Sequence, residues 1–283
     1  MRFEEKPVQL ESGVDWRALW LEERAGRDGI EDAAFWDRRA QGFSASCQRS
    51  PYAREYLERA GVRPGETVID MGCGSGTLAL PLAAEGHAVT ACDLSGKMLE
   101  RLEEQAIADG VASRIDLRQL SWLDGWEDLP VADVFLASRS LYSTDLRETI
   151  LKMERHARRR VCLTVSTIDG PAHDNTMLRA IGRPCSERSE SVYVVNLLLQ
   201  MGRFPELSYI SHVKPVFGST AEELRSEFER EDGPFTPEEA RLLEEFIAEQ
   251  FEPTEKPDGT PAMARRYDRP VRWAFIAWEP PLR

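Results

Sequence analysis

The 283-residue sequence contains little cysteine and little histidine, and neither is arranged as a frame for a metal or for disulfides. Its five cysteines are odd in number and form no CxxC pair, which argues against a zinc ribbon and a disulfide scaffold. Its four histidines are scattered along the chain. We therefore expect no metal site. Cys73, Cys92 and Cys162 lie in or beside apolar runs and are expected to be buried free thiols.

Long apolar runs are also missing. No stretch reaches the length that a membrane-spanning helix needs, and the first residues, MRFEEKPVQL, lack the apolar core of a secretory signal. The composition, 42% hydrophobic and 30% charged, is that of an ordinary globular protein. We expect a cytoplasmic protein that has no membrane partner.

Positive charge is scarce. The chain has 36 Lys and Arg against 49 Asp and Glu, a formal net charge of −13, whereas a nucleic-acid-binding domain is expected to carry a basic patch. The one dense basic run, RHARRR from Arg155 to Arg160, lies at the end of a predicted helix, where cations interact favourably with the helix dipole. We expect a small-molecule substrate and no nucleic-acid partner, with the protein a monomer or a homodimer.

The chain changes character near residue 64. Residues 1–64 carry apolar residues at helical spacing and are predicted to form a helical cap or lid, in which Trp36 and Phe43 either cover the site or pack in a core. From residue 65, short apolar runs alternate with helical patterns, which predicts βαβ units and a mainly parallel sheet. We expect residues 65–283 to form this domain, with helical insertions at about 170–206 and 219–256.

Three glycines between a predicted strand and a predicted helix give the main functional signal. The stretch VIDMGCGSG places Gly72, Gly74 and Gly76 two residues apart, after Asp70. Glycine permits positive φ and lets a ligand approach the backbone closely. A second predicted strand ends at Asp93, about 20 residues further on, where a carboxylate can accept the hydroxyls of a ribose. The alternative is that both aspartates have a structural role alone, as helix caps.

These motifs resemble those of the class I S-adenosylmethionine-dependent methyltransferases, and most of all the small-molecule type that includes quinone and biotin-pathway enzymes. VIDMGCGSG resembles the first motif of that family, VTACDLSGKML the second, and LPVADVFLASRSLY the region of the fourth strand. The resemblance implies a Rossmann-like α/β fold: a mainly parallel seven-stranded sheet with helices on both faces and the last strand antiparallel. It also implies S-adenosylmethionine as cofactor, with S-adenosylhomocysteine as product.

The resemblance also assigns site residues. Asp70 would help to hold the methionine ammonium, the glycine loop would pass under the methionine part, Asp93 would bind the ribose, and Ser138 would lie near the sulfonium. The complete set of expected cofactor-binding residues is Asp70, Gly72, Cys73, Gly74, Gly76, Asp93, Leu94, Met98, Ser121, Trp122 and Ser138. Met98 and Trp122 have a core role as their alternative.

The acceptor side is less specific. Methyl transfer from a sulfonium is an in-line displacement that depends mainly on alignment, and a general base is needed only when the acceptor arrives protonated. The candidate bases are His173 and Tyr142, and the candidate substrate-binding residues are Arg139, Asn175, Tyr193 and Asn196. For His173 the alternative is a surface-loop histidine, and for Arg139 it is an ion pair at the acidic surface.

Other functions are left open. The sequence ASRS follows the fourth predicted strand where amino-methylating enzymes carry Asn/Asp-Pro-Pro-Tyr/Phe, which disfavours methylation of adenine or glutamine. Thr77 replaces the third glycine of a dinucleotide fingerprint, which disfavours a nicotinamide-dependent oxidoreductase. A protein or RNA methyltransferase and a non-catalytic S-adenosylmethionine-binding module remain alternatives.

Overall fold

The computed structural model describes residues 13–25, 32–40, 51–168, 175–184, 189–214, 217–218, 220–255, 259–267 and 269–281. Contacts divide the chain into two units. The first contains Met1–Val165, Glu190–Ile210 and Ala274–Arg283, and the second contains Ser166–Ser189 and Ser211–Trp273. The segment 190–206, predicted as part of an insertion, groups with the first unit.

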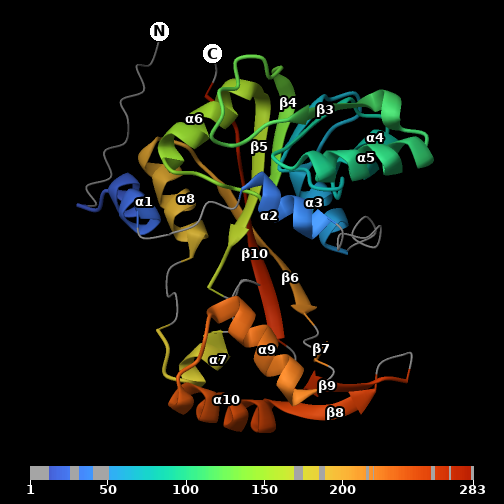
Figure 1. Cartoon of the computed structure of the whole chain (residues 1–283). Helices are drawn as coiled ribbons and strands as arrows, with labels where there is room; N and C mark the ends of the chain where they lie inside the picture. The colour runs from blue at the N-terminus through green and yellow to red at the C-terminus, as the bar shows by residue number, and fades with distance from the viewer. Residues whose placement is uncertain are drawn as a thin grey trace. The chain divides into compact units, whose positions relative to one another are not determined.

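A seven-stranded sheet forms the centre of the first unit, in the order β3-β2-β1-β4-β5-β10-β6 (Figure 1). Its strands are β1 (Val68–Met71), β2 (Val89–Asp93), β3 (Ile115–Gln119), β4 (Ala132–Ser138), β5 (Ala157–Ser166), β6 (Glu206–Lys214) and β10 (Arg269–Trp278). β1 pairs in parallel with β2 and β4, β2 with β3, and β4 with β5, while the last strands run antiparallel. The predicted fold class is therefore confirmed.

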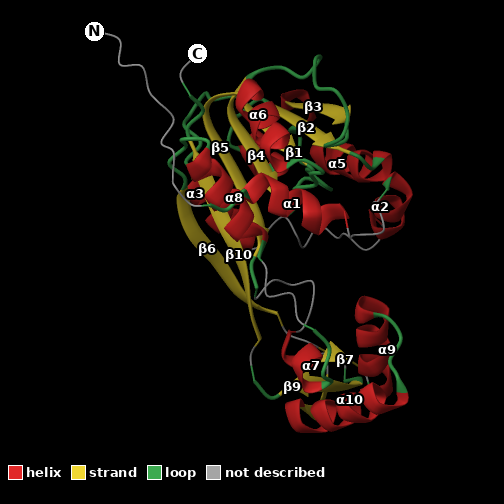
Figure 2. Ribbon diagram, turned by 90° about the vertical axis from the view of Figure 1, so that its left-hand side faces the viewer, coloured by secondary structure: helices red, strands yellow, loops and turns green. Residues whose placement is uncertain are grey.

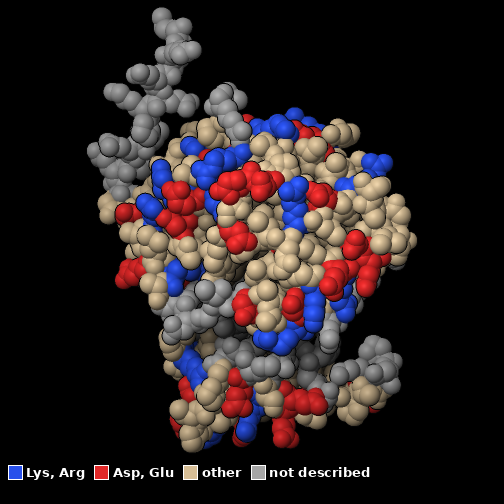
Figure 3. Space-filling model, turned by 45° about the horizontal axis from the view of Figure 1, so that its top comes forward, with Lys and Arg blue, Asp and Glu red and all other residues tan. Residues whose placement is uncertain are grey.

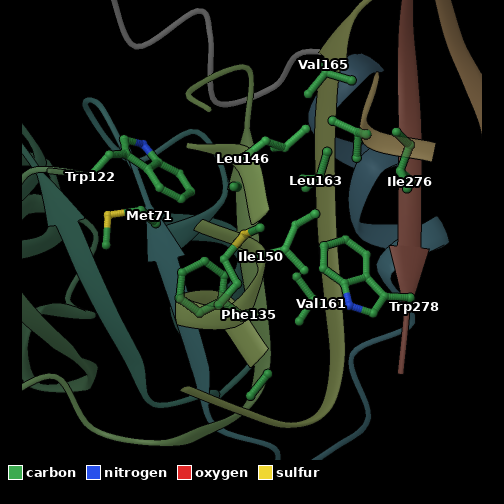
Figure 4. Close-up of a cluster of buried hydrophobic side chains, with 14 of the residues drawn as sticks. Met71, Trp122, Phe135, Leu146, Ile150, Val161, Leu163, Val165, Ile276 and Trp278 are labelled. Carbon is green, nitrogen blue, oxygen red and sulfur yellow. The ribbon is translucent and has the colours of Figure 1, made fainter. Parts of the chain in front are cut away.

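The central strands are apolar because both of their faces are covered. All four residues of β1 are buried, and neighbouring strands bring Phe135, Val161 and Ile276 onto one face of the sheet. Leu146 and Ile150 of the following helix pack against these side chains (Figure 4). Continuous apolar runs of this kind are typical of parallel strands between two helical layers.

Helices lie on both sides of this sheet, as Figure 2 shows. They are α1 (Trp16–Ala25), α2 (Ala33–Ala40), α3 (Pro51–Ala60), α4 (Ala79–Ala84), α5 (Gly96–Ala108), α6 (Leu146–His156) and α8 (Glu190–Gln200), with a short 3₁₀ turn at Ala112–Arg114. Polar caps fix two helix starts: Ser95 accepts from the Met98 amide, and Asp145 accepts from the Arg147 and Glu148 amides.

The basic run 155–160 lies at a helix end only in its first two residues, because α6 ends at His156. β5 begins at Ala157, so Arg158, Arg159 and Arg160 belong to a strand. Pairing with β4 decides the conformation, and acidic partners, Asp133, Glu66 and Glu206 in that order, neutralise the three arginines. The face in Figure 3 shows positive and negative side chains intermixed, with no large area of one sign.

The second unit has its own sheet and its own core. Its elements are α7 (Asn175–Ala180), β7 (Phe217–Gly218), α9 (Ala221–Asp232), α10 (Pro237–Gln250), β8 (Phe251–Glu255) and β9 (Pro261–Arg265), with the antiparallel strand order β7-β9-β8. Thr236 and Glu239 form a reciprocal capping box at the start of α10. The rings of Phe228, Phe246 and Phe251 meet edge-on within the core.

Two features are absent from the described part of the chain. No helix in this part of the chain combines the length and the apolar character needed to cross a membrane. Nor does this part of the chain contain a group of three or more His, Cys, Asp or Glu placed to hold a metal ion.

Candidate functional site

A cavity of about 360 Å³ lies within the first unit, where β1, β2 and β4 end. The carboxyl ends of parallel strands are the usual place for a ligand in an open α/β sheet. We divide its wall into a glycine-loop half, defined by Asp70, Gly72, Gly74 and Asp93, and a β4 half, defined by Ser138, Arg139, Ser140 and Tyr142. The remaining lining residues are Trp36, Met71, Cys73, Ser75, Thr77, Leu78, Leu94, Met98, Leu120, Ser121, Trp122, Leu123 and Leu141.

The three glycines of the loop serve different purposes, although all have positive φ (Gly72 +72°, Gly74 +53° and Gly76 +95°). A Cβ on Gly72 would lie 2.2 Å from Cβ of Ser140, and one on Gly76 would lie 2.4 Å from Cδ1 of Leu102. A Cβ on Gly74 would meet nothing within 4 Å. Gly72 and Gly76 therefore permit close packing, whereas Gly74 keeps the cavity wall open for a ligand.

Asp70 is a buried carboxylate that lacks a partner. It is the penultimate residue of β1 and is 1% exposed, and neither carboxylate oxygen has a hydrogen-bond partner. Burial, followed by the negative charge of Asp93, raises the pKa of Asp70 to about 7; the Ala79 amide opposes the shift without reaching hydrogen-bond geometry. An unpaired buried carboxylate is costly. A ligand cation in the cavity would relieve this cost.

Asp93, at the end of β2, is held by backbone amides. Oδ2 accepts from the Gly74 amide at 2.8 Å, and Oδ1 accepts from the Ser95 amide at 2.9 Å. Burial raises the pKa of Asp93, and these two amides oppose the increase. A carboxylate has about four acceptor positions. Asp93 is thus fixed in orientation and can still accept hydrogen bonds from the hydroxyls of a ligand.

An indole lies in the wall between β3 and β4. Trp122 is 8% exposed, its Nε1 has no hydrogen-bond partner, and its ring packs 5.5 Å from that of Trp126. Leu94, Met98 and Ser121 also line the cavity, and Met98 is buried. Trp122 therefore belongs both to the core and to the wall, and it brings an unused donor to the site.

Helix α2 adds to the wall a residue that the sequence suggests only as part of a lid. Trp36 lines the cavity, and the adjacent Asp37 accepts from Ser95 Oγ at 2.5 Å at the start of α5. The hydrogen bond from Ser95 lowers the pKa of Asp37. This contact holds α2 beside the end of β2. Phe43, the other predicted lid aromatic, lies outside the described residues.

The β4 half is built mainly from hydroxyl groups. Ser138 Oγ lies 2.9 Å from Tyr52 Oη, and Ser140 Oγ donates to the Met71 carbonyl at 2.6 Å. Arg139 and Tyr142 complete this half. Tyr52 belongs to α3, so a helix that precedes the glycine loop in sequence supports the end of β4.

The structure brings most of the predicted residues together. The cavity is lined by Asp70, Gly72, Cys73, Gly74, Asp93, Leu94, Met98, Ser121, Trp122, Ser138, Arg139 and Tyr142. Burial raises the pKa of the Cys73 thiol well above its usual value, so Cys73 is no nucleophile. Cys92 and Cys162 are also buried free thiols.

Four other predicted residues are not in the cavity wall. Gly76 supports the loop through packing. Tyr193 is buried between Trp16 and Trp20, and its hydroxyl donates to Glu23. Asn196 donates to the Val192 carbonyl of its own helix, and Asn175, in the second unit, donates to the Ile168 carbonyl. His173 lies outside the described residues.

Sequence patterns do not reveal Ser140 or Tyr52 as parts of the site. Ser140 lies in the quoted ASRS segment but has no typical motif around it. Tyr52 reads as one apolar position of a helix, and only the packing of α3 on the ends of β4 and β5 gives it a role. The Tyr52 hydroxyl, a polar group on an otherwise apolar helix face, is the only sign of this role in the sequence.

Comparison with known proteins gives a consistent family. A family model described as "Methyltransferase domain" matches residues 68–170. An uncharacterized protein of Haemophilus influenzae is 34% identical over 214 residues, which cover 75% of this chain and 79% of the relative. A release factor glutamine methyltransferase of Cereibacter sphaeroides is 37% identical over 122 residues, and a ubiquinone biosynthesis O-methyltransferase of Chromobacterium violaceum is 31% identical over 98. The matches cover only 44% and 41% of these two enzymes.

Solved structures agree on the fold. Coclaurine N-methyltransferase, bound to N-methylheliamine and S-adenosylhomocysteine, aligns with a TM-score of 0.50 at 13% identity over 96% of this chain and 89% of its own. A structure concerned with conversion of a disulfide bond into a thioacetal group during echinomycin biosynthesis aligns with a TM-score of 0.51 at 18% identity, over 88% of this chain and 92% of its own. At such identities the likeness concerns the fold alone.

Proposed function

The chain belongs to the class I S-adenosylmethionine-dependent methyltransferases, and from this premise we propose that it transfers a methyl group from S-adenosylmethionine to a small-molecule acceptor. The family implies the cofactor. The acceptor class is inferred from the chain's own residues, because the named relatives are matched over less than half of their lengths.

The observation that carries the proposal is the unpartnered carboxylate of Asp70. It is buried, lines the cavity, and has no hydrogen-bond partner for either oxygen. An ammonium group is the cation that such a carboxylate favours, because a charge-assisted hydrogen bond replaces the lost hydration. The amino group of the methionine part supplies that cation, and the open space over Gly74 lets the backbone approach it.

The other cofactor contacts follow from the same wall. We assign the ribose hydroxyls to Asp93, whose orientation the Gly74 and Ser95 amides fix. Leu94, Met98, Ser121 and Trp122 would enclose the adenine. Ser138, at the end of β4, would lie near the methyl donor. The roles predicted for Gly72 and Cys73 are contacts through the backbone.

The chemistry asks little of the side chains. When bound, S-adenosylmethionine supplies a methyl group activated by a sulfonium leaving group. The residues of this chain hold the acceptor in line and exclude water, and the apolar wall formed by Trp36, Leu141 and Trp122 suits that task. Where the acceptor carries a proton, we propose that Tyr142 Oη accepts it while it passes its own hydroxyl proton to the solvent. His173 stays an alternative base, and Asn175, Tyr193 and Asn196 stay predicted acceptor contacts that lack support from the cavity wall.

A small acceptor is favoured over a macromolecule by three features. One matched relative is a ubiquinone biosynthesis O-methyltransferase. Another is a release factor glutamine methyltransferase, but this chain reads Ser-Arg-Ser-Leu at 138–141, without the Pro-Pro pair of amino-methylating enzymes. The intermixed charges of Figure 3 and the paired arginines of β5 also offer no basic track for RNA.

Calorimetric titration with S-adenosylmethionine, S-adenosylhomocysteine and NAD tests the cofactor. We expect micromolar affinity for the first two and no heat with NAD. Asp93→Ala is the matched variant and should lose affinity without losing its fold. Binding of NAD alone would overturn the proposal. Once binding is established, transfer of a labelled methyl group to fractionated metabolites, but not to protein or RNA fractions, would support a small acceptor.

A further inference from the structure

Arg139 has an unusual backbone at the start of the β4 half. It directly follows β4, and its φ of +57° makes it the only non-glycine residue with positive φ in the described part of the chain. Side chains with a Cβ avoid this region, and residues held there gather at functional sites. The positive φ of Arg139 therefore points to a functional role of its side chain.

The surrounding contacts enforce this conformation. The Arg139 amide donates to Thr164 Oγ1 at 3.0 Å, while Ser138 Oγ contacts Tyr52 and Ser140 Oγ donates to the Met71 carbonyl. The residues on both sides of Arg139 are thus tied to different elements. The chain turns sharply between them and directs the arginine to the cavity wall.

An aromatic ring supports the guanidinium. Cζ of Arg139 lies 4.2 Å from the centroid of the Tyr52 ring. That ring is 4% exposed, and its hydroxyl lies 2.6 Å from Thr164 Oγ1 and 2.9 Å from Ser138 Oγ. A guanidinium whose Cζ lies over an aromatic ring presents N–H groups in the planar fork that matches an oxyanion. Tyr52 therefore acts as a fixed platform for the cation.

Charge is unevenly distributed in the cavity. Among the described residues that line it, Arg139 is the only Lys or Arg, while Asp70 and Asp93 lie in the glycine-loop half. The other residues of the β4 half, Ser138, Ser140 and Tyr142, are uncharged. An anionic group of an acceptor thus has one favourable place in this wall, at Arg139.

We propose that the acceptor carries a carboxylate or phosphate group, which Arg139 binds through its guanidinium edge, and that Tyr52 is a positioning residue for Arg139. This inference rests on the proposed function and names its substrate class. The apolar and aromatic side chains around the cavity, Trp36, Leu141, Tyr142 and Trp122, suit an apolar or aromatic body on the same molecule.

The test uses simple probes on the full chain, with and without saturating S-adenosylhomocysteine. Benzoate and phenyl phosphate present the two oxyanions on the same ring, and benzamide is the neutral match of benzoate. We expect at least one oxyanion to bind in calorimetry with a Kd of a few millimolar, at least tenfold more tightly than benzamide. Which of the two binds identifies carboxylate or phosphate as the group.

Variants separate binding from fold stability. Arg139→Met and Arg139→Gly should each weaken the bound oxyanion at least tenfold, and Arg139→Lys should weaken it less. Arg139→Gly should keep or raise the melting temperature, because glycine accepts φ of +57°. Tyr52→Phe keeps the ring and should retain affinity, whereas Tyr52→Leu should lose it. Arg147→Met, at an exposed ion pair with Glu148, is the control and should change nothing.

Three results would overturn the inference, and a fourth would count against the proposed function. Equal affinity of wild type and Arg139→Gly for the oxyanion, or benzamide binding as tightly as benzoate, would overturn the inference. So would the absence of oxyanion binding to the wild type at about 20 mM, where millimolar affinity saturates the site. Failure of the wild type to bind S-adenosylhomocysteine would instead count against the proposed function, because the oxyanion arm is measured without it as well.

Discussion

The glycine-loop half and the β4 half of the cavity are built in different ways. The first comes from two short segments, 70–74 and 93–95, in which backbone amides and carboxylates contact one another directly. The second is held from a distance: Tyr52 of α3, Thr164 of β5 and Met71 of β1 all fix residues 138–140. A local motif can thus specify a shared cofactor, whereas the acceptor side depends on elements far apart in sequence.

The largest expected effect is on the free energy of unfolding, and it compares Gly72 and Gly74, two glycines of the same loop. Gly72→Ala places a Cβ against Ser140 at positive φ and should lower the free energy of unfolding by ~2–4 kcal/mol. In Gly74→Ala the new Cβ meets no neighbouring atom, and only the positive φ is unfavourable. This variant should lower the free energy of unfolding by ~1–2 kcal/mol. Urea denaturation followed by fluorescence measures both. Equal losses of stability would show that the loop does not pack on β4 as described.

The second effect is on cofactor affinity, and it distinguishes the glycine-loop half of the cavity from the β4 half. Asp93→Asn removes the charged acceptor that we propose for the ribose, and should weaken the binding of S-adenosylhomocysteine roughly 10- to 100-fold, the effect of losing charge-assisted hydrogen bonds. Tyr142→Phe, in the β4 half, should leave that affinity within threefold. Calorimetry on both variants gives the comparison. A loss of affinity in Tyr142→Phe as large as that in Asp93→Asn would mean that the two halves are not distinct.

The third effect is a pH dependence of the ligand-free protein. The pKa of Asp70 is raised to about 7 in the folded state, so between its unfolded pKa and pH 7 the folded state binds one more proton than the unfolded state. This contribution to stability is present at low pH and is lost as pH rises through 7, by about 1 kcal/mol between pH 6 and 8.

Asp70→Asn removes that titration and is the variant that tests it. Its stability should fall less between pH 6 and 8 than that of the wild type, since only Asp93 and the other groups remain. In the wild type, saturating S-adenosylhomocysteine should keep Asp70 ionised at both pH values. The loss of stability between pH 6 and 8 that Asp70 causes should then disappear. An identical pH profile in variant and wild type would show that Asp70 is ionised without a ligand.

The smallest effect concerns Trp122. Trp122→Phe removes an indole N–H that has no partner in the cavity wall, so little hydrogen bonding is lost without ligand. If the cofactor accepts from this N–H, affinity should fall about fivefold, the worth of one neutral hydrogen bond. Titration of the variant with S-adenosylhomocysteine measures this. Unchanged affinity would leave Trp122 with its core role alone.

Particular elements show how far the sequence could be read. Helix α5, Gly96–Ala108, can be read from the sequence, because a serine cap and a helical apolar pattern agree there. The arginines of β5 mislead, since cations at a helix end and cations on a paired strand look alike in sequence. β8 and β9 were missed because Pro253 and the polar residues beside it give no alternating pattern, and the strands form only by pairing with each other.

The sequence by itself determined the βαβ pattern that predicts a parallel sheet, the glycine loop and the two aspartates near the ends of β1 and β2, because each is encoded in a short stretch of chain by its apolar pattern and its turn residues. Only the tertiary structure decided that Asp70 lacks a partner, that Gly76 packs on Leu102 away from the wall, and that Tyr193 packs against α1. It also brought Tyr52 beneath Arg139, 87 positions later in the chain. Burial and contact between distant segments create these features, and neither leaves a periodic signal in sequence.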